Sequence, residues 1–306
     1  MTPAASQQTP LRKPAWLRVR IPQGDHCANV QACLDKRRLN TVCVSAKCPN
    51  RAECWDRHTA TFMILGDTCT RNCGFCAVRH GAPSPPDREE PLRIAQAAVS
   101  MGLDYVVLTS VTRDDLPDGG ATAWASTIEA VRQANPRCKI EVLVPDFAGK
   151  EDSILTVLAA RPDVFGHNME TVPRLYPAVR SHAVFERSLR VLQTAGQRGF
   201  PVKTGLMLGL GESDEDLNEL LVRLEKIKTS ILTLGQYLQP TRHHLPVRRY
   251  VSPEDFNIWR DRALSMGFKE VFAGPLVRSS YHAGEHAEKF LQNLPPRARS
   301  EFDGKI

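Results

Sequence analysis

The chain has 306 residues, of which 42% are hydrophobic, and this is enough to bury the core of one barrel-sized domain with extensions. Its net charge of +6 is too small to indicate nucleic acid as a partner, and no apolar run approaches the roughly 18 residues of a membrane span. Nine cysteines, six of them between positions 43 and 76, are typical of metal thiolates in a reducing compartment rather than of a disulfide framework. The first ten residues show no secretory signal. We therefore expect a cytoplasmic protein that binds neither nucleic acid nor a membrane.

Residues 1–60 show no sustained periodicity, so we expect them to form an irregular N-terminal extension that bound metal helps to order. From residue 61 onward, short apolar runs alternate with helical patterns, and the runs predict six strands over residues 61–66, 105–109, 140–144, 164–167, 202–208 and 231–238. Ser213 and Ser252 each precede acidic residues in the pattern of a helix N-cap. Helices are therefore expected from Ser213 to Lys228 and from Ser252 to near Gly267.

Repeated strand–helix–strand order requires right-handed crossovers in a parallel sheet. Six such units predict an α/β fold, a partial (β/α)6 TIM-like barrel over residues 61–270, with its site at the C-terminal ends of the strands. Residues 271–306 form a predicted C-terminal extension.

Three cysteines follow the first predicted strand directly, in the pattern Cys69-x3-Cys73-x2-Cys76. This position is the mouth of the predicted barrel, where catalytic groups of such folds gather. A zinc site normally uses a fourth Cys or His, whereas three thiolates can hold a 4Fe-4S cluster and leave one iron open to another ligand. The spacing therefore favours a cluster over a zinc site or inert buried cysteines.

Another group of three, Cys43, Cys48 and Cys54, lies ahead of the barrel and also lacks an obvious fourth ligand. In chain order this group is the first triplet, and Cys69, Cys73 and Cys76 are the second triplet. A second cluster is the natural interpretation. A zinc knuckle completed by a histidine such as His58 is the alternative.

The second triplet, with Phe75 just before its last cysteine, resembles the signature of the radical S-adenosylmethionine (SAM) superfamily. The first triplet and the closing Arg278-Ser279-Ser280-Tyr281 together resemble the lipoyl synthase (lipoic acid synthase) family, and further blocks of that family are matched at residues 111–116, 167–171, 203–209 and 235–241. Departures occur at Val44-Ser45, Gly166 and Ser213, none of which is a predicted ligand.

The resemblance implies two 4Fe-4S clusters as cofactors and SAM as co-substrate. The radical SAM cluster is then held by Cys69, Cys73 and Cys76, and its fourth iron by SAM. The auxiliary cluster is held by Cys43, Cys48, Cys54 and, as the resemblance alone indicates, by Ser279. Polar residues near the ends of the later strands are assigned to SAM and substrate contacts together with Phe75, although caps and salt bridges are the alternative: Asn168, Glu170, Lys203 and Gln236. No catalytic residue is expected beyond the cluster ligands.

The activity that the resemblance implies is insertion of two sulfur atoms at C6 and C8 of a protein-bound N6-octanoyl-lysine, with the auxiliary cluster as sulfur donor. Implied partners are octanoylated lipoyl carrier domains, namely 2-oxoacid dehydrogenase E2 subunits and the glycine cleavage H protein. A ferredoxin or flavodoxin-type electron donor and an iron–sulfur carrier protein are also implied. Another two-cluster radical SAM enzyme, a noncatalytic iron–sulfur electron carrier and a zinc-binding module are the alternatives.

Three cysteines and two histidines fall outside these motifs. Cys27, Cys33 and Cys138 are expected to be small apolar residues or exposed thiols. His282 and His286 are spaced four apart, but Gly284 weakens a helix between them, so a surface or supporting role is expected.

Overall fold

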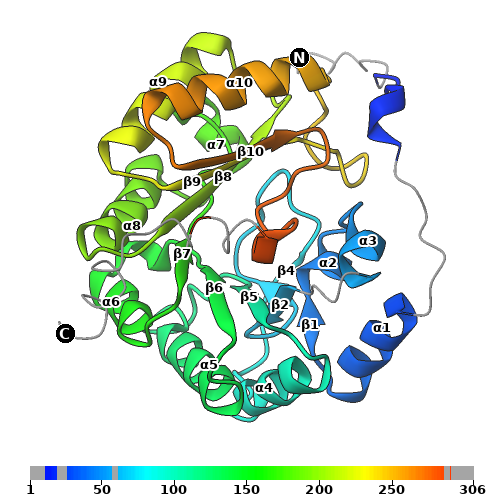
Figure 1. The fold of residues 1–306 in the computed structure, drawn as a ribbon, viewed down its shortest axis with the longest axis vertical. Coiled ribbons are helices and arrows are strands. Elements are labelled where there is room, and N and C mark those ends of the chain that lie inside the picture. The colour runs from blue at the N-terminus through cyan, green and yellow to red at the C-terminus, as the bar shows by residue number, and fades with distance from the viewer. Residues whose placement is uncertain (1–10, 19–25, 57–60, 286–289, 291–306) are drawn as a thin grey trace, which may run out of the picture.

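The computed structural model describes residues 11–18, 26–56, 61–285 and 290. Its main element is an eight-stranded sheet in the order β1-β2-β5-β6-β7-β8-β9-β10. All neighbouring strands are parallel except the pair β1 and β2. The strands span Asn40–Thr41, Thr61–Ile64, Tyr105–Ser110, Lys139–Leu143, Val164–Gly166, Val202–Leu208, Ile231–Gln236 and Glu270–Gly274. Figure 1 shows this sheet curled into an open barrel with helices around its outer face.

The predicted partial barrel is confirmed, with two differences in its strands. The predicted strands 61–66 and 231–238 end earlier, at Ile64 and Gln236. Two strands of the sheet were missed, β10 and the two-residue β1. Strand β10 pairs with β9 along its whole length and begins at Glu270, where the predicted barrel ends. Strand β10 is short and only Val271 in it is buried, which hides it from a search for apolar runs.

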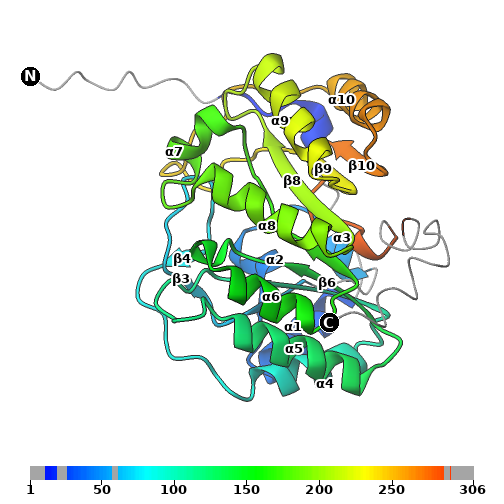
Figure 2. The ribbon, with the colours of Figure 1, turned by 90° about the vertical axis from the view of Figure 1, so that its left-hand side faces the viewer.

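Helices cover the outside of the sheet because each presents one apolar stripe to it. In α9, Asp214–Lys226, the buried residues recur at helical spacing as Leu217, Leu220, Leu221 and Leu224. The other outer helices are α4 (Glu90–Ser100), α5 (Ala121–Ala134), α6 (Glu151–Ala159), α7 (Tyr176–Val179), α8 (Phe185–Gln197) and α10 (Pro253–Met266). Figure 2 shows α5, α6 and α8 covering one side of the sheet.

The two capped helices agree with their predicted starts. Ser213 forms a capping box with Asp216 at the start of α9, and Ser252 accepts a hydrogen bond from the Asp255 N–H at the start of α10. Helix α10 ends at Gly267, whose φ of +110° is readily adopted only by glycine.

Part of the N-terminal extension is helical rather than irregular. Helices α1 (His26–Lys36), α2 (Val42–Ser45) and α3 (Arg51–Asp56) lie beside the open edge of the barrel near β1 and β2 (Figure 1). Burial explains this order, because Leu34 and Trp55 are each about 1% exposed within the main core. The C-terminal segment after β10 returns to the centre of the barrel (Figure 1).

Candidate functional site

The second cysteine triplet lies on the loop that follows β2 and includes the short strands β3 (Thr68–Cys69) and β4 (Arg79–His80). Cys69 Sγ accepts hydrogen bonds from the main-chain N–H groups of Arg71, at 3.4 Å, and Thr112, at 3.3 Å. These two contacts fix the position of one of the three sulfurs of the loop.

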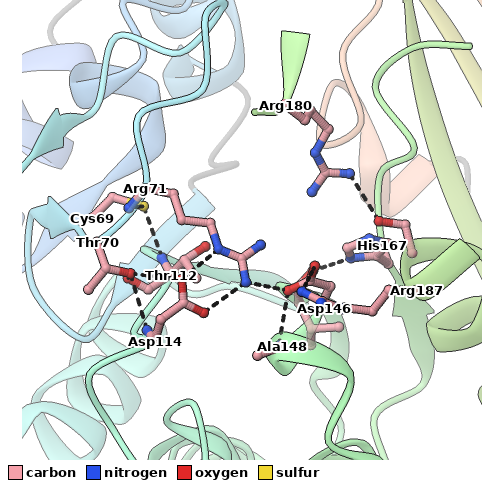
Figure 3. A network of polar contacts seen from close by, with 12 residues as sticks. Cys69, Thr70, Arg71, Thr112, Asp114, Asp146, Ala148, His167, Arg180 and Arg187 are labelled. Atoms are coloured by element: carbon pink, nitrogen blue, oxygen red, sulfur yellow. Dashed lines mark hydrogen bonds and ion pairs between the residues drawn. The ribbon is translucent and has the colours of Figure 1, made fainter. Parts of the chain in front are cut away.

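A partly buried ion network fixes this loop against the ends of β5 and β6 (Figure 3). Arg71 donates to both carboxylate oxygens of Asp114, at 2.6 and 2.8 Å, and to Asp146 Oδ1 at 2.7 Å. Burial opposes the Arg71 charge, but the hydrogen bonds with Asp114 and Asp146 raise its pKa overall. Burial also opposes the charge of Asp146 by raising its pKa, but the hydrogen bond and charge of Arg71 outweigh burial, and the net shift of the Asp146 pKa is downward. Because breaking a buried ion pair leaves an uncompensated charge, this contact holds the loop rigidly.

The three thiols of the second triplet lie close enough to influence one another. Burial, opposed by a backbone hydrogen bond and reinforced by Cys73 and Cys69, raises the pKa of Cys76 to about 12. Burial is also the main cause of the raised pKa of Cys73, which Cys69 and Glu170 reinforce and Arg180 opposes. His244, in the loop after β9, donates through Nε2 to the Cys76 carbonyl at 2.9 Å. The second triplet is thus one shielded group of sulfurs.

Arg180, just after α7, supplies a buried positive charge beside this group. Its Nη1 donates to the Asn168 carbonyl at 2.8 Å and to the Tyr176 hydroxyl at 2.9 Å, both of which are neutral. Its Nε has no hydrogen-bond partner in the part of the chain that the structure describes. A buried guanidinium in these surroundings favours an anion nearby. A cluster ligated by thiolates, or a ligand carboxylate, fits that requirement.

The first triplet is positioned by α2, the turn after it and α3. Thr41 caps α2 by accepting the Cys43 N–H at 3.2 Å, and Cys43 and Cys54 are both buried. Burial first, then the neighbouring Cys48 and Cys43, raises the pKa of Cys54 to about 12. Burial also raises the pKa of Cys48, and Arg278 opposes that shift. These three sulfurs also form one group.

The C-terminal segment, residues 276–282, docks directly on the first triplet. Asn50 Nδ2 donates to the Leu276 carbonyl at 2.6 Å, and Tyr281 donates to Glu53 Oε1 at 3.0 Å. The His282 ring lies 3.2 Å from the same Glu53 oxygen. Glu53 immediately precedes Cys54, so these contacts bring Ser279 to the neighbourhood of the first triplet.

Two glycines give this segment its place inside the barrel. A Cβ atom at Gly205 of β8 would lie 2.5 Å from Ser279 Oγ and 2.9 Å from Asn168 Oδ1. A Cβ atom at Gly235 of β9 would overlap the carbonyl oxygen of Val277. Only glycine at these two positions lets the chain approach so closely. The cysteine groups and the buried arginine have the chemistry that iron–sulfur binding requires, namely thiolate ligands and a compensating positive charge.

The predicted SAM contacts do not all lie together. Asn168 and Glu170 adjoin, with Asn168 Nδ2 donating to Glu170 Oε1 at 3.1 Å, and burial raises the pKa of Glu170. Phe75 packs against a separate small cluster formed by Val179, Leu210 and Tyr237.

Lys203 and Gln236 are engaged elsewhere. Lys203 Nζ lies at the start of β8, 2.8 and 2.9 Å from the two carboxylate oxygens of Glu141. Gln236 Oε1 accepts the Val251 N–H, and its Nε2 lies within 3.1 Å of the carbonyls of Leu208, Tyr237 and Arg249. Both side chains brace the barrel, and their contact with SAM stays a prediction.

No single-ion site appears among these residues. Within the described ranges, no three His, Cys, Asp or Glu side chains gather closely enough to hold one metal ion. Thiolates that bind separate irons of a cluster lie farther apart than the ligands of one ion, so the triplets stay candidates for clusters. His58 and His286, which belong to the zinc alternative and the paired-histidine pattern, lie outside the described residues.

Sequence reasoning missed several residues of this site. Glu212 is buried and accepts the main-chain N–H groups of Gly209, Leu210 and Gly211, which fixes the loop after β8. Asp146 follows the predicted strand 140–144, and a polar residue just after a barrel strand is a candidate site residue. Arg180 is a single arginine in a loop, and nothing in its sequence neighbours marks it.

Comparison with known proteins assigns the chain to a class. Residues 63–224 match the model of the radical SAM superfamily. SuiB of Streptococcus suis bound to S-adenosylmethionine superposes with a TM-score of 0.57 at 13% identity, covering 73% of this chain and 53% of that one. Methylornithine synthase (PylB) superposes with a TM-score of 0.52 at 14% identity, covering 78% and 83%. These structures share the fold, and the chain is a member of the radical SAM superfamily.

Sequence relatives identify the family within that class. The lipoyl synthase of Rubrobacter xylanophilus is 52% identical over 90% of this chain and 87% of its own length. The lipoyl synthase of Leptospira interrogans is 50% identical over 92% and 94%. The chain belongs to the lipoyl synthase family and is therefore a radical SAM enzyme of the sulfurtransferase type. Among the described residues, no helix has the length and apolar character of a membrane span.

The buried His167 makes stability depend on pH. Its Nδ1 lies 2.8 Å from the Val144 carbonyl, and burial, with Arg180 as the next cause, lowers its pKa to about 4. In the unfolded chain a histidine titrates near 6.5. Between these values only the unfolded state binds the proton, so the free energy of unfolding falls as the pH decreases from about 6.5 to 4, by up to about 3 kcal/mol from this group.

Urea unfolding of the cluster-free protein at pH 7 and at pH 4.5 measures this loss. We expect His167→Asn, which does not titrate, to lose distinctly less stability between the two pH values than the wild type. Equal losses would show that His167 does not carry the effect.

The glycine cradle predicts a selective loss of iron. Gly205→Ala and Gly235→Ala should displace residues 277–279 and cut the iron of the reconstituted protein from about eight atoms toward four, because only the first triplet loses its docked segment. Iron and sulfide analysis measures the loss. Gly199→Ala is the control for backbone strain away from this segment, because its φ of +82° disfavours alanine although a Cβ there would meet nothing within 4 Å. Eight irons in both cradle variants would contradict the role of the docked segment.

Proposed function

We propose that the protein inserts sulfur at C6 and C8 of an octanoyl chain amide-linked to a lysine of a lipoyl carrier domain. The observation that carries the proposal is the docking of residues 276–282 on the first triplet and inside the barrel. This docking joins the first triplet, through Ser279 and Asn168, to the residues beside the second triplet. A simple radical SAM barrel has no need of such a connection.

In this proposal Cys69, Cys73 and Cys76 hold the radical SAM cluster, and Cys43, Cys48, Cys54 and Ser279 hold the auxiliary cluster. When bound, the two clusters supply the electron that cleaves SAM and the sulfur that enters the product. The chain keeps the second triplet in place through Arg71 and its two aspartates. Because burial raises the pKa of Cys54 and of Cys76 to about 12, loading the sites with metal must release protons from these two thiols.

Recognition of SAM is assigned to the predicted residues Phe75, Asn168, Glu170, Lys203 and Gln236. Asn168 and Glu170 have the strongest support, because they adjoin each other and lie near Arg180. Lys203 and Gln236 support the barrel wall through Glu141 and main-chain groups. Their influence on SAM is therefore expected to be indirect.

The proposed substrates are octanoylated lipoyl domains of 2-oxoacid dehydrogenase E2 subunits and of the glycine cleavage H protein. We also propose a ferredoxin or flavodoxin-type electron donor, an iron–sulfur carrier protein that rebuilds the consumed cluster, and a cytoplasmic location. Family membership and the cysteine pattern support these assignments. The long lysyl-octanoyl arm suits a site enclosed by the barrel, where water is excluded from reactive species.

Product analysis tests the proposal. The protein, reconstituted anaerobically with iron and sulfide, should add two sulfur atoms to an octanoyl-lysyl peptide in the presence of SAM and a reductant, with formation of 5′-deoxyadenosine. Mass spectrometry measures both products. Deoxyadenosine without sulfur gain would move the protein to another substrate, and neither product from a two-cluster sample would contradict the enzyme assignment.

Cys76 and Cys54 form a matched pair for separating the two triplets, because burial raises the pKa of each to about 12. Cys76→Ala should abolish SAM cleavage, since the proposed SAM-binding cluster loses a ligand. Cys54→Ala should retain SAM cleavage and abolish sulfur insertion. The same two assays measure both, and equal loss of both activities in folded variants would contradict the division of labour.

A further inference from the structure

Asn168 connects the C-terminal segment to the residues beside the second triplet. Its side-chain Oδ1 accepts a hydrogen bond from Ser279 Oγ at 2.8 Å, and its Nδ2 donates to Glu170 Oε1 at 3.1 Å. Opposite ends of one amide therefore contact Ser279 and Glu170. The main-chain carbonyl of Asn168 is engaged separately by Arg180, so a change of the side chain leaves that contact available.

The orientation of this amide is set by its surroundings. Glu170 is held in the sheet by hydrogen bonds from its own N–H to the Gly205 carbonyl, at 2.9 Å, and from the Met207 N–H to its carbonyl, at 2.8 Å. Because Glu170 accepts from the amide nitrogen, the amide oxygen is the end that faces Ser279. Gly205 leaves room for the pair, since a Cβ there would crowd both oxygens.

An amide oxygen has no hydrogen to donate, so Ser279 must be the donor in this contact. The contact consequently stabilises Ser279 only while its oxygen carries a hydrogen. A serine that ligates iron as an alkoxide has none, and the negative end of the amide dipole then faces its charge. Asn168 therefore favours the free hydroxyl of Ser279 over the ligating alkoxide.

We propose that Asn168 is a positioning residue that receives the Ser279 hydroxyl when the serine leaves its iron, and that it thereby makes Ser279 a releasable ligand. This inference rests on the proposed assignment of Ser279 to the auxiliary cluster. On release, the iron–oxygen bond would break with its electron pair on the oxygen, which would take one proton from a water molecule, and the hydroxide left would replace the serine oxygen on the iron. No electron is transferred, and the new hydroxyl donates to Asn168 Oδ1.

Transfer of iron to the chelator ferrozine tests the proposal in the full-length two-cluster protein. The reaction is run anaerobically without reductant, at a SAM concentration that saturates each variant, so that SAM binds and is not cleaved. Iron release is followed over time, and the kinetic phase that is missing in Cys54→Ala is the release of iron from the first triplet. Asn168→Ala should slow that phase about 2- to 10-fold, the size expected from the loss of one hydrogen bond.

Three variants make the result specific. Asn168→Asp keeps an acceptor for Ser279 but loses the donor to Glu170, and should release iron at least as fast as the wild type. Ser280→Ala should match the wild type. In a Ser279→Ala background, Asn168→Ala should have no further effect, because the hydroxyl that Asn168 receives is gone.

Unchanged or faster release in Asn168→Ala would overturn the proposal, as would an equal slowing in the Ser279→Ala background. Failure of the underlying assignment of Ser279 to the auxiliary cluster would be recognised from other measurements. Wild-type protein that binds only about four irons, or a Ser279→Ala variant with an unaltered Mössbauer spectrum of the auxiliary cluster, would contradict the two-cluster site itself.

Discussion

The docking of residues 276–282 between the first-triplet helices and the barrel strands is the contact on which the rest of the site depends. It combines close packing on the barrel glycines Gly205 and Gly235 with two hydrogen bonds on the side of the first triplet, one donated by Asn50 and one donated by Tyr281 to Glu53. Neither extension could form this site alone, because each supplies only part of the polar groups. The barrel provides the rigid wall against which both are held.

Charge balance is the second requirement, and buried arginines meet it. Arg71 is paired with two aspartates and fixes the second-triplet loop. Arg180 instead meets neutral partners directly, which leaves its charge for an anion near Cys73. Burial lowers the pKa of Arg278, while the nearby Cys48 and Glu170 oppose that shift. Arg71, whose charge is balanced by aspartates, holds the fold. Arg180, whose direct partners are neutral, is the arginine available to a bound anion.

The barrel and the cysteine groups could be predicted from the sequence, because apolar runs, helix caps and cysteine spacing each involve residues that lie close together in the chain. Ser213 and Ser252, for example, mark helix starts through their immediate neighbours. Lys203 shows the limit of such reasoning. It lies at the beginning of β8, whereas sites of this fold gather at strand ends, and its ion pair with Glu141 spans 62 positions of the sequence. The contact of Ser279 with Asn168 spans 111 positions, and only the resemblance to a known family pointed to that serine.

A crystal structure of the protein with both clusters bound would test the central claim most directly. The account predicts that Ser279 Oγ ligates an iron held by Cys43, Cys48 and Cys54, while Val277 and Ser279 still pack on Gly235 and Gly205. A water molecule or another side chain on that iron, with residues 276–282 outside the barrel, would contradict it.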